Sequence, residues 1–279
     1  MARRQTATLR AVRPVPPAWE LHLDLEVVPQ AGCYVLADLG GPLREPLFPS
    51  VVDGDGFSTV VPRGHPATRL LPGSPVDVLG PLGHGFRLAA IGHALDRLLL
   101  IAEVDDLPWL QPLYQAAPSV ALVVEATTRL RLPAPSRFPP TLELTMVTRD
   151  GSTGYLGPIE EDGPAPAGVV RVLPRLRELM AWAECICVAA DVVRYPALAR
   201  LVKDVRYLPQ ADFAQALVRV SMPCGVGACD ICRVTTRHGE RHACVDGPVF
   251  DLMDFTGESA RRVSRSRGGR PHGVNEAIA

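Results

Sequence analysis

Four cysteines near the C-terminal end of this 279-residue chain have a spacing that suits metal chemistry. The segment SMPCGVGACDIC, residues 221–232, carries three of them, and the fourth follows after eleven further residues. The four are Cys224, Cys229, Cys232 and Cys244. Thiolates at such close spacing are ligands for zinc or for an iron–sulfur cluster. The other three cysteines lie in apolar stretches typical of buried strands, and we expect no ligand role for Cys33, Cys185 and Cys187.

The separations between the four cysteines favour one of these metals. Structural zinc sites usually combine two pairs of ligands, each pair separated by two residues, and only Cys229 and Cys232 form such a pair. A 2Fe–2S cluster of the plant type uses separations of four and two residues with a distant fourth cysteine. Gly225 and Gly227 suit the four-residue loop, because glycine tolerates positive φ and allows the backbone to approach the cluster. The sequence therefore predicts a 2Fe–2S cluster, with zinc as the alternative.

The rest of the chain must position this segment, and its pattern changes along the sequence. WELHLDLEV, residues 19–27, alternates apolar and polar side chains, and short strand-like stretches follow up to about residue 90. Strands at that spacing predict a small antiparallel barrel. From about residue 95, apolar stretches such as RLLLIAEV and SVALVVEA alternate with the helical patterns LPWLQPLYQAA, LPRLRELMAWAE and YPALARLVKDV. This alternation predicts a parallel α/β layer that is covered on both faces.

We therefore expect an α+β protein of several domains. The expected units are a β-barrel over residues 1–92, an α/β domain over 93–215, a small cluster lobe over 216–258 and a disordered basic tail over 259–279.

The bulk composition narrows the classes of function. The formal net charge of -1 offers no electrostatic basis for binding nucleic acid. No apolar stretch reaches the length of a signal peptide or a membrane span, so we expect a cytoplasmic protein without membrane insertion. In a reducing compartment, clustered cysteines indicate metal or redox chemistry rather than disulfides.

The sequence also resembles a known family. MPCGVGACDICRV and HACVDGPVF resemble the cluster segment of the electron-transfer subunit of class B dihydroorotate dehydrogenase. VDVLGPLGHGF at residues 76–86 and RDGSTGYLGPI at residues 149–159 are similar to two further segments of that family. The resemblance implies a ferredoxin-reductase-like architecture, in which an FAD-binding barrel precedes an NAD-binding α/β domain and a 2Fe–2S lobe.

The nucleotide-binding motifs of the family are altered in this chain. The family has a glycine-rich loop after the first strand of the α/β domain, whereas this chain has IAEVDDLPWL, with Glu103, Asp105 and Asp106. Carboxylates there repel a pyrophosphate, which a glycine loop and a helix N-terminus would attract. A later Cys-Gly-Pro motif is replaced by CVAADVV. We therefore expect that NAD(H) binding is lost.

The flavin motif is only partly retained. The family carries an Arg-x-Pro-x-Ser stretch in the barrel, and REPLFPS keeps the arginine and proline but has Phe48 where the hydroxyl is expected, unless Ser50 replaces it. The phosphate loop that follows is replaced by RGHPAT, in which Pro66 has no N–H to donate. FAD is retained as a possible cofactor, and its candidate contacts are Arg44, Pro46 and Thr68.

The expected function is that of an iron–sulfur electron-transfer subunit with no catalytic residue of its own. It would relay electrons to or from a partner flavoprotein of the dihydroorotate dehydrogenase type in a hetero-oligomer. Met222, Val226 and Ile231 are expected either to form an apolar rim for that partner or to pack inward. Three alternatives remain. They are a complete NAD(P)H-dependent FAD/2Fe–2S reductase, a structural adaptor in which the metal only holds the lobe folded, and a regulatory iron–sulfur sensor, for which the near-neutral charge gives no nucleic-acid site.

Overall fold

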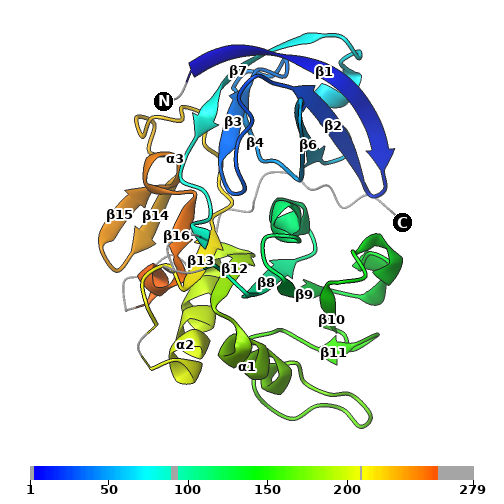
Figure 1. Cartoon of the computed structure of the whole chain (residues 1–279), viewed down its shortest axis with the longest axis vertical. Coiled ribbons are helices and arrows are strands. Elements are labelled where there is room, and N and C mark those ends of the chain that lie inside the picture. Colours follow the sequence, from blue (N-terminus) through cyan, green and yellow to red (C-terminus); the bar gives the residue numbers. More distant parts are fainter. Residues whose placement is uncertain (1–2, 89–93, 208, 257–279) are drawn as a thin grey trace.

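The structure, a computed structural model, describes residues 3–88, 94–207 and 209–256. The predicted basic tail, residues 259–279, lies outside them. Figure 1 shows a barrel-like sheet above an α/β layer, with the cysteine-rich segment packed along one side of both. Within the described ranges, no helix combines the length and the apolar character needed to cross a membrane.

The N-terminal unit is a seven-stranded antiparallel sheet in the order β4-β3-β7-β1-β2-β6-β5. Its strands are β1 (Arg3–Val15), β2 (Ala18–Asp24), β3 (Tyr34–Ala37), β4 (Glu45–Leu47), β5 (Val51–Asp53), β6 (Gly56–Val61) and β7 (Pro75–Leu82). The alternation in β2 places Leu21 and Leu23 in the interior, while Glu20, His22 and Asp24 are only partly buried. A short 3-10 turn, η1 (Pro66–Arg69), follows β6.

The second sheet has the order β11-β10-β9-β8-β12-β13-β16. Its strands are β8 (Arg97–Glu103), β9 (Ser119–Ala126), β10 (Glu143–Thr148), β11 (Tyr155–Leu156), β12 (Cys185–Ala189), β13 (Ala214–Leu217) and β16 (Val249–Asp251). All neighbours are parallel except β16, which is antiparallel to β13. The strand order reverses between β8 and β12, and in such sheets ligands bind outside the carboxyl ends of the strands at this switch point.

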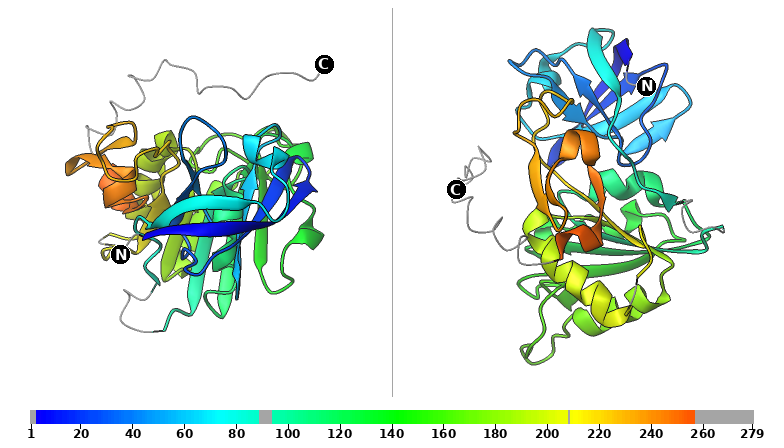
Figure 2. Two further views of the ribbon diagram at one scale, coloured as in Figure 1. Left: turned by 90° about the horizontal axis from the view of Figure 1, so that it is seen from above. Right: turned by 90° about the vertical axis from the view of Figure 1, so that its left-hand side faces the viewer.

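The two α-helices of this layer lie on the face away from the barrel (Figures 1 and 2). They are α1 (Leu173–Trp182) and α2 (Tyr195–Val205). The helical pattern after β8 forms a 3-10 helix, η3 (Leu107–Leu113), and Pro108 and Pro112 within it have no N–H to donate. The helix η3 packs against β8, β12 and the barrel strand β5. Further 3-10 turns are η4 (Arg129–Arg131), η5 (Pro135–Arg137), η6 (Val192–Arg194) and η7 (Leu252–Phe255).

The cysteine-rich segment folds as a hairpin and one short helix. The hairpin pairs β14 (Arg233–Thr236) with β15 (Gly239–His242), and α3 (Ala243–Asp246) follows directly. The chain then enters β16 and completes the edge of the α/β sheet. The segment is therefore anchored in the sheet at both of its ends, between β13 and β16 (Figure 2).

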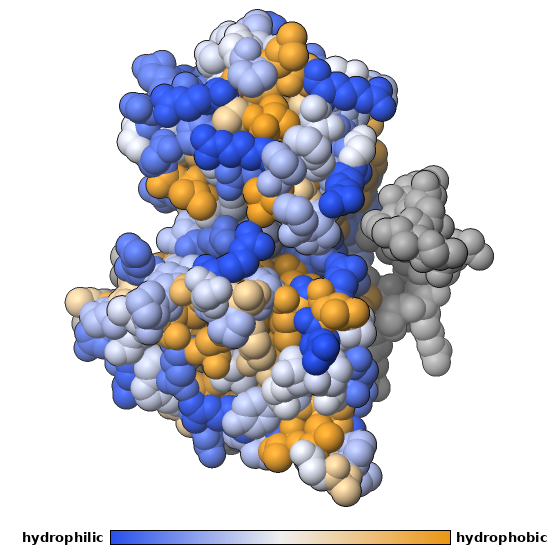
Figure 3. All heavy atoms as spheres, turned by 90° about the vertical axis from the view of Figure 1, so that its right-hand side faces the viewer, coloured by the Kyte–Doolittle hydropathy of each residue, from blue (hydrophilic) through white to orange (hydrophobic). Residues whose placement is uncertain are grey.

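Buried apolar side chains form two cores. The smaller lies within the barrel, and the larger fills the α/β layer and extends into the cysteine-rich segment. Three barrel residues belong to the larger core, namely Tyr34, Leu36 and Phe48. Apolar packing is therefore continuous from the barrel into the α/β layer. Figure 3 shows from outside the narrower waist between these two units.

Candidate metal centre

The four predicted ligands come together where the cysteine-rich segment meets the barrel. Cys224 and Cys229 lie in the loop after β13, Cys232 directly precedes β14, and Cys244 lies in α3. Cys232 and Cys244 are buried, whereas Cys224 and Cys229 are half-buried. None of the four forms a disulfide.

The four sulfurs meet as two pairs. Sγ of Cys229 lies 3.3 Å from Sγ of Cys224, and Sγ of Cys232 lies 3.3 Å from Sγ of Cys244. Both separations are well beyond the about 2.05 Å of a disulfide bond. Among the described residues, no group of three or more His, Cys, Asp or Glu side chains converges closely enough to hold a single metal ion. The donor set is thus four free thiols arranged two by two.

Backbone N–H groups around the sulfurs favour the thiolate form that binds metal. Burial acts to raise the pKa of Cys224, but the N–H of Val226, the Cys229 thiol and further backbone N–H groups lower it to about 6. The N–H of Gly227 donates to Sγ of Cys244 at 3.1 Å. Burial and the neighbouring Cys232 thiol nevertheless raise the pKa of Cys244 to about 12. The pKa of Cys224 is thus lowered and that of Cys244 is raised, so binding of a metal would have to deprotonate Cys244.

Both glycines of the loop adopt the positive φ expected from the sequence. Gly225 has φ +67°, and a Cβ on it would lie 2.7 Å from Cδ1 of the barrel residue Leu36. Gly227 has φ +73°, and a Cβ on it would lie 3.2 Å from Cγ2 of Val245. The loop can therefore lie close against both the barrel and α3 only because these positions carry no side chain.

Contacts from distant parts of the sequence hold the segment against the barrel. The N–H of His84 donates to the carbonyl of Gly247 at 2.6 Å, and the hydroxyl of Tyr34 donates to the carbonyl of Cys244 at 3.4 Å. Gly83 lies so close that a Cβ on it would be 2.5 Å from Cδ of Pro248. Sequence reasoning did not identify Tyr34 or Gly83 as part of this site, because each is far from the cysteines along the chain.

The apolar residues expected near the cluster differ in exposure. Met222 is fully buried in the larger core, whereas Val226 is 64% and Ile231 49% exposed. Val245, which the sequence analysis did not single out, is 47% exposed beside Cys244. Val226, Ile231 and Val245 are thus exposed apolar side chains, each within two residues of a cysteine ligand.

A buried ionic network lies at the switch point of the α/β sheet. Arg194, after β12, donates to Glu103 at the end of β8 at 2.7 Å and to Glu125 of β9 at 2.9 Å. Glu160 also accepts a hydrogen bond from Arg194. Arg149 donates to both Glu103 and Glu125. Arg194 and Glu125 are buried, and the pKa of Arg194 is raised by these carboxylates despite its burial. Glu103 also accepts the N–H of Asp191. This network occupies the sheet edge where a parallel α/β domain binds its nucleotide.

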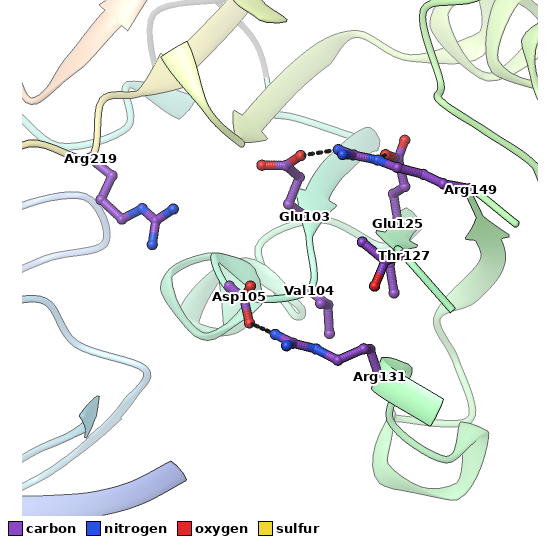
Figure 4. A pocket seen from close by; sticks show the side chains of 9 residues that line it. Glu103, Val104, Asp105, Glu125, Thr127, Arg131, Arg149 and Arg219 are labelled. Atoms are coloured by element: carbon purple, nitrogen blue, oxygen red, sulfur yellow. Dashed lines mark hydrogen bonds and ion pairs between the residues drawn. The ribbon is translucent and has the colours of Figure 1, made fainter. Parts of the chain in front are cut away.

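The pocket beside this network is small and carries both signs of charge (Figure 4). Its volume is about 160 Å³, below the roughly 300 Å³ at which ligand pockets begin. Its three arginines are each paired with an acid: Arg131 with Asp105, Arg149 with Glu103, and Arg219 with Asp106.

The carboxylate of Asp106 is buried in this region without a hydrogen bond. Neither of its carboxylate oxygens has a hydrogen-bond partner, although Nε of Arg219 lies 3.1 Å from Oδ1 as an ion pair. Burial raises the pKa of Asp106 to about 7, against the opposing effect of Arg219 and with the help of Glu103. A buried carboxyl of this kind opposes a second anionic group at the same edge.

The candidate flavin contacts are all engaged within the barrel. Arg44 donates to the carboxylate and the carbonyl of Asp77, and Pro46 lies in β4 opposite Leu36. The hydroxyl of Thr68 donates to the carbonyl of His65 at 2.7 Å. The side chain of His65 in turn accepts a hydrogen bond from the N–H of Ala67. In a phosphate-binding loop that N–H would instead bind the phosphate. The residues present therefore do not fit the flavin and its phosphates.

The position where the family has a hydroxyl carries a buried ring. Phe48 lies between Tyr34, with ring centroids 5.5 Å apart, and Trp109 of η3, with centroids 5.3 Å apart. Ser50, the possible substitute, donates its hydroxyl to the carbonyl of Ser58 and is itself buried.

Comparisons with known proteins agree with this architecture. A family model described as the iron–sulfur cluster binding domain of dihydroorotate dehydrogenase B matches residues 220–256. The dihydroorotate dehydrogenase B (NAD(+)) electron transfer subunit of Bacillus caldolyticus is 32% identical over 225 residues, which cover 75% of this chain and 78% of that protein. The probable subunit of the same name from Thermoplasma acidophilum is 26% identical over 246 residues, covering 87% and 86%. The solved structure of an NADH-dependent reduced ferredoxin–NADP oxidoreductase has a TM-score of 0.66 at 18% identity and covers 94% of both chains.

The fold and the four cysteines define an iron–sulfur protein of ferredoxin-reductase-like architecture. Within that class, the chain belongs to the family of dihydroorotate dehydrogenase B electron transfer subunits. The predicted family, the predicted fold class and the electron-transfer function are thereby confirmed.

Proposed function

We propose that this chain binds a 2Fe–2S cluster through Cys224, Cys229, Cys232 and Cys244 and exchanges single electrons with a catalytic flavoprotein of the dihydroorotate dehydrogenase type. The observation that carries the proposal is the arrangement of the four sulfurs in two pairs. In a binuclear cluster with four cysteine ligands, each iron is bound by two thiolates. A single zinc ion would require all four to converge on one point.

The residues of the chain hold and tune this group. When bound, the cluster supplies one-electron chemistry at a potential that depends on hydrogen bonds to its sulfurs and on burial. Backbone N–H groups of the 225–229 loop point at the cysteine sulfurs and favour their anionic form. Burial of Cys232 and Cys244 and the close barrel contact keep water from that side. On the opposite side, the surface near the cysteines carries the exposed apolar side chains of Val226, Ile231 and Val245.

That apolar surface is the proposed contact with the catalytic flavoprotein. Electron transfer requires the two redox groups to be close, and the three side chains flank the cysteines without a further layer of protein over them. The relatives are named as electron transfer subunits of dihydroorotate dehydrogenase B, and we extend that assembly to this chain as a hetero-oligomer.

We further propose that the chain does not bind NAD(H). The switch point is filled by the Glu103–Arg194–Glu125 network, and no glycine lies between β8 and η3. The 3-10 helix η3 does not offer the N-terminus of a full α-helix to a pyrophosphate. The arginines beside this edge are paired with Glu103, Asp105 and Asp106, so they are not free to bind a pyrophosphate.

The direct test is metal and ligand analysis of the anaerobically purified protein. We expect about two irons and two acid-labile sulfides per chain, and sharp loss of both after substitution of any one ligand by serine. Cys187→Ser is the matched control, because Cys187 is buried in β12 with no ligand role, and its visible spectrum should be unchanged. Stoichiometric zinc without sulfide would refute the cluster and favour the structural adaptor. Calorimetric titration with NADH and NADPH should give no heat of binding, and micromolar affinity for either would favour the complete reductase.

A further inference from the structure

We infer that the aromatic stack Tyr34–Phe48–Trp109 takes the place of the flavin ring, so that this chain holds its metal centre without FAD of its own. The inference adds to the proposed function and concerns a different part of the molecule. It rests on what the side chains of the barrel and of η3 contact.

Phe48 is the first of two aromatic rings that lie in the altered flavin and nucleotide motifs. It occupies the position of the hydroxyl in the family's flavin motif, it is 5% exposed, and it belongs to the core of the α/β layer rather than to that of the barrel. A phenyl ring offers no hydrogen bond to a flavin or a phosphate. The residue therefore converts a ligand-facing position into a domain contact.

Trp109 is the second ring, and it comes from the other domain. It lies in η3, directly after the loop that replaces the glycine-rich nucleotide motif. Its ring centroid lies 5.3 Å from that of Phe48 with a tilt of 41°. A flat ring inserted between two others at ordinary contact distances of about 3.5 Å needs centroids about 7 Å apart. The contact therefore leaves no room for an isoalloxazine ring between them.

Both ends of the stack reach the cysteine-rich segment. Tyr34 packs on Phe48 and donates its hydroxyl to the carbonyl of Cys244. At the other end, the guanidinium of Arg219 lies over the ring of Trp109 at 5.8 Å, and Arg219 is five residues before Cys224. The stack thus joins the barrel, the α/β layer and the metal segment where a shared cofactor would otherwise lie between them.

The polar groups that would hold the flavin's phosphates are also engaged. Arg44 is paired with Asp77, and Nε2 of His65 lies 2.6 Å from Oε2 of Glu45. The hydroxyl of Thr68 and the N–H of Ala67 are bonded within η1. FAD would have to break these contacts as well as separate Phe48 from Trp109.

The consequence for function is that the chain has no two-electron centre of its own. Both its electron donor and its electron acceptor must then be groups outside this chain: the flavin of the catalytic partner on one side and a second one-electron redox group on the other.

The test compares the FAD affinity of the full-length, iron-loaded wild-type protein with that of Phe48→Ser/Trp109→Ala. FAD is titrated into each protein, and bound flavin is measured by fluorescence and by release on acid precipitation. We expect no stoichiometric binding by the wild type and an affinity at least about tenfold higher in the double variant. Phe138→Ala is the matched control, because it removes one ring of the Tyr114–Phe138 pair, which includes neither Phe48 nor Trp109, and it should not increase FAD binding.

Two results would overturn the inference: stoichiometric FAD in the wild type, or a folded double variant that gains no affinity. If the double variant does not fold, Phe48→Ser alone is compared with Phe48→Leu, which keeps the position apolar and filled. A gain of FAD affinity in the serine variant only then supports the inference, and equal affinity in both contradicts it. Iron and sulfide are counted in the same samples, so loss of the metal centre would count against the proposed function and not against the aromatic stack.

Discussion

Glu103 and Arg194 meet across the switch point of the α/β sheet, with Oε1 of Glu103 2.7 Å from Nη1 of Arg194. Glu103 ends β8 and Arg194 follows β12, so this one ion pair joins the two strands at which the order of the sheet reverses. In nucleotide-binding relatives of this fold class the same edge receives a pyrophosphate. Here it is bridged by the protein's own charges.

Removing Arg194 should destabilise the fold strongly. Arg194→Met leaves the buried Glu125 with only the half-exposed Arg149 as a cationic partner, and breaking a buried pair on one side costs up to about 3–5 kcal/mol of unfolding free energy. Arg175→Met is the control, because Arg175 pairs with the exposed Glu143 and Glu178 and such pairs contribute about 0–1 kcal/mol. Denaturant unfolding of both variants measures the difference. Equal, small losses would mean that the network does not stabilise the switch point.

Stability should fall as pH rises towards neutrality because of Asp106. Its pKa is raised from 3.8 to about 7 by burial, so the folded state binds its proton more tightly than the unfolded state does. The contribution is therefore most favourable below about pH 4 and is lost as the pH rises to about 7. Asp106→Asn cannot ionise and should raise the free energy of unfolding near pH 8, by at most about 4 kcal/mol, with little change near pH 4. A variant equally stabilised or destabilised at both pH values would contradict the assignment.

Gly83→Ala should loosen the metal segment from the barrel. Gly83 has φ +77°, and an added Cβ would lie 2.5 Å from Cδ of Pro248 and 2.9 Å from the carbonyl oxygen of Gly247. Gly64→Ala is a close control, since Gly64 also has φ +77° but has nothing within 4 Å of an added Cβ. The backbone strain is the same in both variants, so the difference in melting temperature and in iron retention on dilution isolates the steric contact. Similar losses of stability and iron in both variants would show that the positive φ, and not the contact with Pro248, causes the effect.

Charge on the apolar surface beside the cysteines should slow electron exchange with the catalytic flavoprotein. Ile231→Asp places a carboxylate at a position that is 49% exposed and adjacent to Cys232, while the sulfur ligands themselves are unchanged. We expect slower interprotein electron transfer in stopped-flow experiments with an unaltered visible spectrum. Leu130→Asp, at an exposed apolar residue of η4, is the control and should leave the rate unchanged. If the wild type, Ile231→Asp and Leu130→Asp transfer electrons at the same rate, the contact with the flavoprotein lies on another surface.

The sequence by itself determined the metal-binding segment and the order of the domains. The four cysteines lie within 21 consecutive residues, so their spacing and the two glycines constrain the local loop almost independently of the rest of the chain. Alternation of apolar residues likewise predicted the barrel strands and the parallel strands, because side-chain direction along an element depends on near neighbours. The same local pattern failed at η3, where two prolines replace an α-helix by a 3-10 helix.

Only the tertiary structure decided how the altered motifs are compensated. From the sequence, Phe48 and the AEVDD loop are only departures from a family pattern, and Arg194 and Trp109 carry no signal that connects them to those departures. Packing brings Trp109 onto Phe48 and Arg194 onto Glu103 and Glu125, and it brings the Tyr34 hydroxyl to Cys244, 210 residues away. Such contacts depend on how separate elements pack in three dimensions, and no periodicity or spacing along the chain encodes them.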